Sequence, residues 1–270
     1  MIIFNVYMSH GITIDIKNLT IGYTGKRSVK VVAKEITESL SSGELTCLLG
    51  ENGAGKSTLL RTLAGFQQPV DGDISIMGKP LKSYSNKDLA RVISVVLTER
   101  TVLQNMTVEE LTGLGRTPYT GFWGTLSEDD RKRVDEALEQ VGITLLKDRQ
   151  IQTLSDGERQ KIMIAKALAQ ETPVIFLDEP TAFLDYPSKV EILRLLHRLS
   201  REQDKTIFIS THDLELALQI ADRIWLMGKG RPVVTGSPEE LTQNGTLESY
   251  LCLPGINIVD KESNPTYSGI

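Results

Sequence analysis

The segment GENGAGKST, Gly50 to Thr58, decides how the chain folds. It matches the pattern G-x-x-x-x-G-K-[S/T], in which glycines let backbone amides turn inward around phosphate groups. The apolar run ELTCLL precedes the segment as a buried strand, and STLLRTLAGF continues it with helical spacing. A glycine-rich turn can match the pattern by chance, but strand, loop and helix in this order predict a phosphate-binding loop.

Two polar residues of this loop have defined roles toward a nucleoside triphosphate. Lys56 would bridge the β- and γ-phosphates, and the Ser57 hydroxyl would bind Mg²⁺. The sequence therefore predicts a nucleotide with Mg²⁺ as the ligand of this loop. The expected nucleotide-binding residues of the loop are Gly50, Glu51, Asn52, Gly53, Ala54, Gly55, Lys56, Ser57 and Thr58.

The acidic pair in VIFLDEP, Val174 to Pro180, forms the second half of the expected site. Four apolar residues place Asp178 at the carboxyl end of a buried strand, where it fits the metal-holding carboxylate that accompanies a phosphate loop. Glu179 could orient or deprotonate the attacking water. An acidic pair after a strand is usually a solvated loop entrance, but beside a phosphate loop it indicates an active site.

His212 in FISTHD also follows a buried strand and precedes a helix. A lone histidine is more often structural than catalytic. Because its strand would end at the same sheet edge as Asp178, a neutral His212 imidazole could contact the γ-phosphate.

The stretch LSDGERQ, which contains Ser155 to Glu158, has two compatible interpretations. Ser-x-x-Glu before an apolar run is a capping box, which needs no function. A helix start also favours an anion, so the amides near Ser155 and Gly157 could meet a phosphate. A carboxylate facing a triphosphate would be repelled by about 1 kcal/mol at about 4 Å in water. Asp156 is therefore expected to point along a subunit interface or toward solvent.

Composition limits the class of protein. The chain has 270 residues, 40% of them hydrophobic and 24% charged, which is ordinary for a soluble globular protein. A net charge of -5 without long charge runs argues against a broad nucleic-acid-binding face. No apolar stretch reaches the roughly 18 to 20 residues of a membrane helix, and the first residues lack a secretory signal. We expect a cytoplasmic protein whose cysteines, Cys47 and Cys252, are unremarkable reduced thiols.

Apolar strands alternate with helical patterns along most of the chain, which predicts an α/β domain with a largely parallel sheet. Residues 12–23 and 29–40 instead alternate apolar with polar residues, as half-buried strands do. The Asp71-Gly72 pair reads as a turn before another such strand. The middle, from about Asn105 to Ala169, is rich in helical patterns.

The motifs GENGAGKST, LSDGERQ, VIFLDEP, TAFLD and STHD, in this order and spacing, resemble the ATP-binding cassette (ABC) ATPases from Ile12 to about Leu253. The resemblance implies an α/β P-loop NTPase (RecA-like) core with an N-terminal antiparallel β-subdomain and an inserted α-helical subdomain. It implies one ABC ATPase domain over residues 12–253. Residues 12–97 and 170–253 would form the core with the β-subdomain, 98–169 the helical subdomain with the signature loop, and 254–270 a C-terminal tail.

The resemblance also implies a head-to-tail homodimer that binds ATP and Mg²⁺. The signature loop of one subunit (Ser155, Asp156, Gly157, Glu158) would close over the ATP held by the phosphate loop of the other. Tyr23 falls where the family stacks an aromatic ring on adenine, although alone it would read as a surface tyrosine. Asp185 of TAFLD would lie at the dimer interface. The implied catalytic residues are Lys56, Glu179 and His212.

The chain departs from the family pattern at two places. Thr98 stands where the family has a metal-reaching glutamine, and the nearest glutamine, Gln104, lies several residues late. Thr98 could supply one hydroxyl ligand to the metal, directly or through water. In the signature loop, Asp156 replaces a glycine and Glu158 a glutamine.

The middle segment is similar to importer ATPases that serve iron-siderophore, haem and vitamin B12 permeases, through GR-x-P-Y followed by WG-x-L-S-x-x-D. This implies a peripheral subunit on the inner face of a bacterial membrane, bound to permease subunits and working indirectly with a substrate-binding protein. The segment RTPYTGFWG would help to form the dock for the permease, and no residue of the chain identifies the cargo.

Two alternatives remain at this stage. A soluble ABC ATPase that acts on nucleic acid or ribosomes usually carries paired cassettes, coiled-coil insertions or basic extensions, which this sequence lacks. A degenerate cassette would bind ATP and regulate without turnover. Intact Lys56, Asp178, Glu179 and His212 argue against that alternative, while Thr98 leaves it open.

Overall fold

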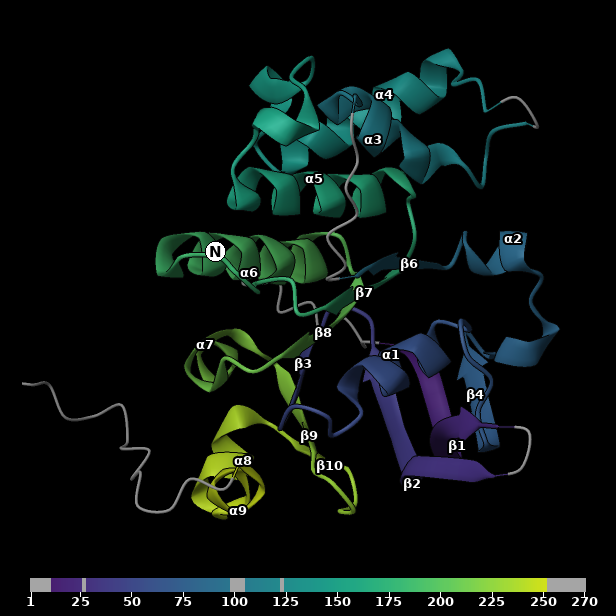
Figure 1. Cartoon of the computed structure of the whole chain (residues 1–270), viewed down its shortest axis with the longest axis vertical. Coiled ribbons are helices and arrows are strands. Elements are labelled where there is room, and N and C mark those ends of the chain that lie inside the picture. The colour runs from purple at the N-terminus through teal and green to yellow at the C-terminus, as the bar shows by residue number, and fades with distance from the viewer. Residues whose placement is uncertain (1–10, 26–27, 98–104, 122–123, 252–270) are drawn as a thin grey trace, which may run out of the picture.

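A six-stranded sheet crosses the centre of the molecule, between helices α6 (Tyr186–Glu202) and α7 (Leu214–Ile220) on one face and helix α1 (Lys56–Leu63) with a second sheet on the other (Figure 1). The computed structural model describes residues 11–25, 28–97, 105–121 and 124–251. Thr98, Gln104, Phe122, Trp123 and Cys252 lie outside these ranges.

Hydrogen bonds join the strands of the central sheet in the order β10–β9–β3–β8–β7–β6. The pairs from β9 to β6 are parallel, and β10 runs antiparallel to β9. The predicted α/β fold with a largely parallel sheet is therefore confirmed. The strands are β3 (Leu45–Gly50), β6 (Ile93–Val96), β7 (Val174–Asp178), β8 (Thr206–Thr211), β9 (Arg223–Met227) and β10 (Val234–Gly236).

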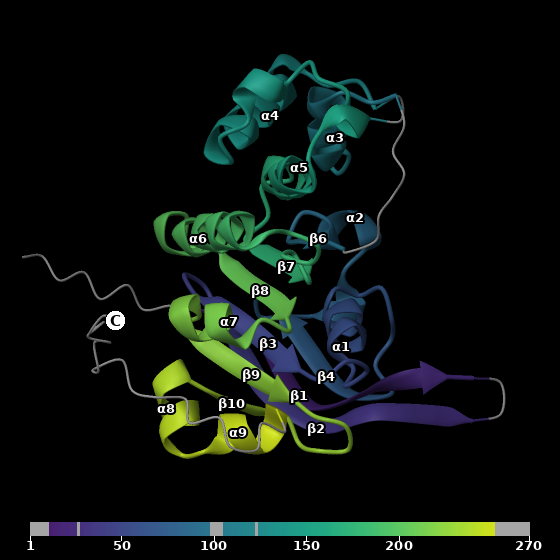
Figure 2. The ribbon, with the colours of Figure 1, turned by 60° about the vertical axis from the view of Figure 1, so that its left-hand side comes forward.

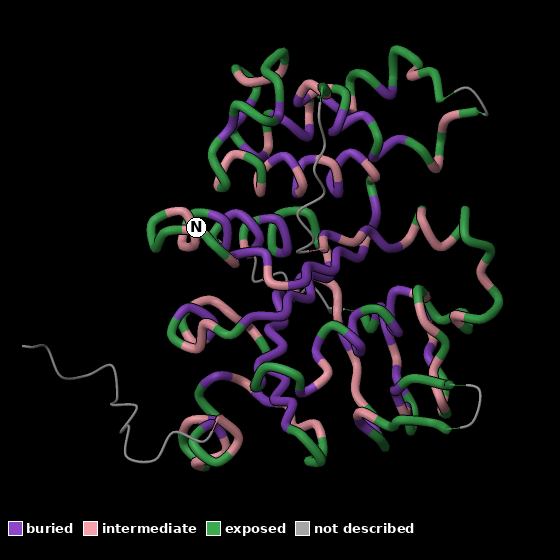
Figure 3. Tube along the Cα trace, in the orientation of Figure 1, coloured by how far each residue is buried: buried purple, intermediate pink, exposed green. Residues whose placement is uncertain are grey.

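The central sheet is buried on both faces, as parallel sheets usually are. Along β3, Cys47 and Leu49 belong to the core cluster that includes α6 and α7, whereas Leu48 belongs to the cluster that includes α1. In Figure 3 most of the trace along these strands has the colour of buried residues. Burial, with the charge of Asp222, raises the pKa of the Cys47 thiol, so this cysteine is inert as expected.

The second sheet is antiparallel, with the order β2–β1–β4–β5. The predicted turn at Asp71-Gly72 is wrong, because both residues begin β4. Gly72 has φ 87°, and a Cβ there would lie 2.4 Å from the carbonyl oxygen of Asn18 on β1. At this pair β4 lies beside β1 with an irregular register, and the two backbones approach so closely that only glycine fits. The strands are β1 (Ile12–Thr24), β2 (Val29–Ser41), β4 (Asp71–Ile76) and β5 (Lys79–Pro80).

Three helices form a layer above the central sheet, between β6 and β7 in the chain (Figures 1 and 2). Their starts are fixed by capping boxes at Thr107, Ser127 and Ser155, in which the side chain accepts from a backbone amide three residues later. The layer consists of α3 (Val108–Gly113), α4 (Glu128–Gln140) and α5 (Asp156–Ala169).

Helix α5 is the connection from this layer back to the sheet. It runs from Ser155 at its N-cap to Ala169, five residues before β7 begins at Val174. The loop LSDGERQ and the acidic pair Asp178-Glu179 therefore lie at opposite ends of one helix–strand unit.

Three further short α-helices lie in the described chain. They are α2 (Asn86–Leu89), α8 (Pro238–Gln243) and α9 (Thr246–Leu251). In the described ranges, no helix has the length and apolar character needed to cross a bilayer.

Candidate active site

The phosphate loop connects β3 to α1 at the carboxyl edge of the central sheet. Gly53 and Gly55 have φ values of 78° and 110°, which other residues rarely adopt. A Cβ on Gly50 would lie 2.1 Å from the carbonyl oxygen of Met227, so the end of β9 packs directly against the loop. The local geometry explains these glycines before any ligand is considered.

Lys56 is a buried cation without a close carboxylate. Its side chain is 6% exposed, and its Nζ donates to the carbonyl oxygens of Gly50 at 2.8 Å and Glu51 at 3.3 Å. Glu179 Oε1 lies 4.0 Å away. Burial lowers the pKa of Lys56, and the charges of Glu179 and Asp178 oppose this effect. An anion in the loop would complete the surroundings of this amine.

Asp178 ends β7 beside the phosphate loop, as the sequence predicts. Its Oδ1 accepts hydrogen bonds from Ser57 Oγ at 3.1 Å and Ser210 Oγ at 2.6 Å. A carboxylate and a hydroxyl are hard oxygen donors of the kind Mg²⁺ prefers, and Mg²⁺ commonly uses few protein ligands together with phosphate oxygens. Ser57 and Asp178 therefore fit the expected metal.

Glu179 is held in a strained backbone conformation. Its φ is 47°, in the left-handed region that costs a non-glycine residue about 1 to 2 kcal/mol. Its amide donates to the carbonyl oxygen of Ser210 at 3.1 Å and is 2.9 Å from Ser210 Oγ. Its carboxylate Oε2 lies 3.6 Å from His212 Nδ1, and the His212 side chain is 56% exposed. The edge of the sheet thus brings Lys56, Glu179 and His212 together.

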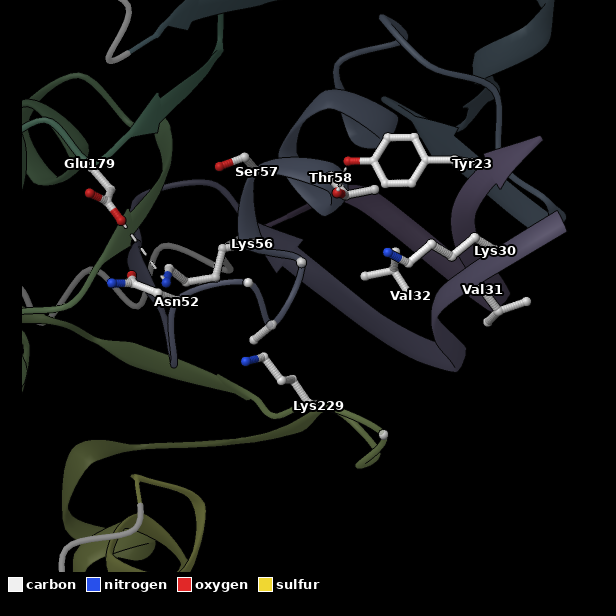
Figure 4. A pocket seen from close by; sticks show the side chains of 14 residues that line it. Tyr23, Lys30, Val31, Val32, Asn52, Lys56, Ser57, Thr58, Glu179 and Lys229 are labelled. Carbon is white, nitrogen blue, oxygen red and sulfur yellow. Dashed lines mark hydrogen bonds and ion pairs between the residues drawn. The ribbon is translucent and has the colours of Figure 1, made fainter. Parts of the chain in front are cut away.

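A cavity of about 590 Å³ extends from Glu179 across the phosphate loop to Tyr23 (Figure 4). The hydroxyls of Tyr23 and Thr58 are 2.8 Å apart, and Tyr23 is 52% exposed. The structure therefore places Tyr23 at the same cavity as the phosphate loop. Whether its ring stacks on adenine stays a prediction.

The signature loop and Asp185 do not line this cavity in the single chain. The Ser155 amide donates to Glu158 Oε2 at 2.8 Å, which closes the capping box that the sequence predicts. Asp156 is half exposed, and its Oδ1 lies 3.7 Å from Arg159 Nη1. Asp185 caps α6 by accepting from the amide of Ser188 at 3.0 Å, and hydrogen bonds from the Ser188 side chain and amide lower the Asp185 pKa.

Two residues at this edge were missed by sequence reasoning. Ser210 contacts both Asp178 and the Glu179 amide, and these contacts depend on the parallel register that pairs it with Asp178, which no local sequence pattern shows. Lys229 lines the cavity from the loop after β9. Its position could not be read from a motif, because only the packing of β9 against the phosphate loop places it there.

The family model described as ABC transporter matches residues 33–182, more than half of the chain. The chain is 41% identical over 241 residues to an uncharacterized ABC transporter ATP-binding protein of Methanocaldococcus jannaschii, covering 89% of this chain and 82% of that protein. It is 37% identical over 232 residues to the ferric enterobactin transport ATP-binding protein of Escherichia coli, with coverages of 86% and 84%.

A third relative is the iron(3+)-hydroxamate import ATP-binding protein of Bacillus subtilis, 34% identical over 248 residues with coverages of 92% and 91%. Among solved structures, an inward-facing metal-chelate type ABC transporter superposes with a TM-score of 0.77 at 27% identity, covering 89% of each chain. The dimeric structure of a bacterial ABC transporter cassette gives 0.72 at 27% identity, covering 83% of this chain and 98% of that one.

The sequence motifs, the two-sheet fold with its helical layer and the matches over most of the chain lead to one assignment. The chain belongs to the ABC transporter family, as one of its ATPase cassettes.

Proposed function

We propose that this cassette energises a bacterial importer for an iron chelate of the siderophore class. The observation that carries the ATPase part is the convergence of Lys56, the Ser57–Asp178 pair and Glu179 at one cavity. The cargo class is supported by two of the relatives described above, which are named for transport of ferric enterobactin and import of iron(3+)-hydroxamate. Haem and cobalamin, which the sequence left open, have no such support.

In the proposed reaction, ATP lies along the phosphate loop with its adenine at Tyr23. The Lys56 amine contacts the terminal phosphates, and Ser57 with Asp178 holds Mg²⁺, which neutralises phosphate charge when bound. Thr98, which lies outside the described residues, is a further possible ligand. These roles are supported by the 3.1 Å Ser57–Asp178 contact and by the burial of Lys56.

Glu179 is the proposed base for the attacking water. Its carboxylate is 27% exposed, so it can meet a water molecule at the mouth of the cavity. His212, 3.6 Å from this carboxylate, would contact the γ-phosphate and help to orient Glu179. The backbone strain at Glu179 supports a functional constraint on this residue.

A second copy of the chain is proposed to complete the site. The helix N-terminus at Ser155 offers backbone amides and a positive dipole end, but it lies away from the cavity in one chain. In a head-to-tail homodimer it would close over the partner's ATP, with Asp185 at the interface. Asp156 would point away from the γ-phosphate, in keeping with its half-exposed carboxylate beside Arg159.

We propose one ABC domain over residues 12–253, with residues 98–169 as the helical subdomain that meets the permease at the inner membrane face. Within the proposed dock, Thr117 and Tyr119 are exposed, whereas Arg116 is buried. Arg116 would therefore support the dock from inside without touching the permease. A substrate-binding protein would act only through the permease.

Reconstitution of the cassette with a permease of the iron-chelate importer class from the same organism tests this function. We expect ATPase activity that Glu179→Gln abolishes, and uptake of a ferric siderophore into vesicles that depends on it. ATPase activity without uptake of any ferric chelate would contradict the cargo class. Stimulation by nucleic acid or ribosomes instead of the permease would favour the soluble alternative.

A further inference from the structure

The loop after β9 places a lysine beside the phosphate loop that has no assigned role. This loop follows Met227 and contains Lys229 and Gly230, both of which line the nucleotide cavity. A Cβ on Gly53 would lie 3.5 Å from Lys229 Cε and 3.8 Å from its Nζ. In Figure 4 the amine of Lys229 points toward the phosphate loop, on the other side of that loop from Tyr23.

The position of Lys229 is fixed by the packing of β9. Gly50 at the end of β3 is paired with Met227 at the end of β9. The Met227 side chain also reaches Gly55, where a Cβ would lie 2.9 Å from Met227 Cε. Lys229 follows Met227 by two residues, so its backbone is held against the glycines that shape the phosphate loop.

Two cations of this loop face different ways. Arg231 Nη1 donates to the carbonyl oxygen of Ser249 at 2.7 Å, and its guanidinium lies 5.3 Å from the centre of the Tyr250 ring. Arg231 thus ties the loop to α9. Within the described ranges, no carboxylate forms an ion pair with Lys229.

The charges around the cavity favour a polyanion. Among the described residues that line it are three lysines, Lys30, Lys56 and Lys229, and one carboxylate, that of Glu179. Lys56 approaches the loop from α1 and Lys229 from the β9 side. A triphosphate in the loop would therefore meet positive charge from two elements.

We propose that Lys229 is a second phosphate-contacting cation of the nucleotide site, which strengthens binding of the phosphate chain without taking part in bond cleavage. This inference rests on the proposed nucleotide-binding role of the phosphate loop. It assigns Lys229 to substrate affinity and leaves the chemistry to Lys56 and Glu179. The signature of such a residue is a change in KM at constant kcat.

The test compares Lys229→Met with Lys229→Arg, which keeps the charge, and with Lys82→Met. Lys82 is 78% exposed and pairs with Asp73 at 3.8 Å, so its loss changes the net charge equally without touching the cavity. Titration calorimetry with Mg-ADP should give a Kd about tenfold higher for Lys229→Met, as expected for one charge-assisted contact. Lys229→Arg should stay within about threefold of the wild type, and Lys82→Met should be unchanged.

Adenosine carries no phosphate, so its affinity shows whether Lys229→Met weakens nucleotide binding through the phosphate chain or in another way. Its affinity should be the same in the wild type and Lys229→Met, and in ATPase assays KM should rise while kcat stays within about twofold. Unchanged Mg-ADP affinity in Lys229→Met, an equal loss of adenosine affinity, or a fall in kcat at constant KM would each overturn the proposal. If the wild type binds no Mg-nucleotide, the proposed function itself fails, which is a different result.

Discussion

Among the described residues two cations are buried, and their surroundings contrast. Arg116, in the helical layer, is 3% exposed and contacts Asp130 Oδ1 at 2.8 Å and Glu171 Oε2 at 2.6 Å. Lys56, in the phosphate loop, is 6% exposed, and its nearest carboxylate is 4.0 Å away. Burial alone would lower the pKa of both groups. The hydrogen bonds that Arg116 donates to Asp130 and Glu171 reverse this effect, whereas the pKa of Lys56 stays lowered.

The difference indicates that Arg116 has a structural role, whereas the charge of Lys56 is available to a ligand. Arg116 also donates to the carbonyl oxygen of Ala169 at 2.8 Å, so it joins the loop after α3 to the end of α5. The guanidinium of Arg116 therefore finds both charged and neutral hydrogen-bond partners within the chain. Lys56 is held by two carbonyl oxygens and by a long ion pair with Glu179, so a bound phosphate adds a close charged partner that the free protein lacks.

Arg116→Met should give the largest effect, a loss of about 3 to 5 kcal/mol in the free energy of unfolding, because it leaves a buried carboxylate without its partner. Urea unfolding followed by circular dichroism measures this loss. Arg91→Met is the control, since Arg91 lies over the same Tyr119 ring but is exposed. Equal losses of unfolding free energy in Arg116→Met and Arg91→Met would contradict the structural role assigned to the buried arginine.

Lys56→Met should reduce ATPase activity about a hundredfold to a thousandfold, equivalent to roughly 3 to 4 kcal/mol, because one phosphate-stabilising donor is lost. Its free energy of unfolding should fall far less than that of Arg116→Met, since the lost pair with Glu179 is 4.0 Å long and that carboxylate is partly exposed. Steady-state kinetics and urea unfolding on the same preparation check both points. A destabilisation as large as that of Arg116→Met would show that Lys56 is a structural charge.

Asp130→Asn should destabilise the chain by about 2 kcal/mol at pH 7. Hydrogen bonds from Ser127, followed by that from Arg116, lower the Asp130 pKa to about 2, below the unfolded value near 3.9. The stabilisation is therefore complete above about pH 4 and is lost as pH falls through about 2. The difference in unfolding free energy between wild type and variant should shrink by about half between pH 7 and pH 3. A difference that stays constant over this range would refute the lowered Asp130 pKa as its origin.

Asp156→Asn should give the smallest effect, a loss of about 0.5 kcal/mol in unfolding free energy, because a half-exposed charge at a helix start is removed. ATPase activity should stay within about twofold, since the carboxylate is expected to face away from ATP. A large rise in activity with Mg-ATP would mean instead that Asp156 repels the γ-phosphate in the dimer.

The sequence predicted those parts of the site that depend on local order. Strand, glycine loop and helix put Lys56 and Ser57 in place, and the ends of β7 and β8 placed Asp178 and His212 at one edge. Ser210 and Lys229 were missed, because their roles arise from strand register and from packing of β9 on Gly50.

The helical layer was predicted as helices, but its central contact was not. Arg116 was assigned to a surface dock, and its burial depends on Asp130 and Glu171, which lie 14 and 55 residues away in the chain. A local sequence pattern cannot show contacts between residues so far apart in the chain. The Asp71-Gly72 turn failed for a similar reason, because the neighbouring strand decides the conformation of Gly72.

We propose that the nucleotide site of one chain is half of a working site. Sedimentation velocity of Glu179→Gln with and without Mg-ATP tests this proposal, because the variant should bind ATP without hydrolysing it. We predict conversion of the 29.9 kDa monomer to a dimer with Mg-ATP, and no conversion when Lys56→Met is added to the same chain. A variant that binds Mg-ATP but remains a monomer at every protein concentration would contradict the claim.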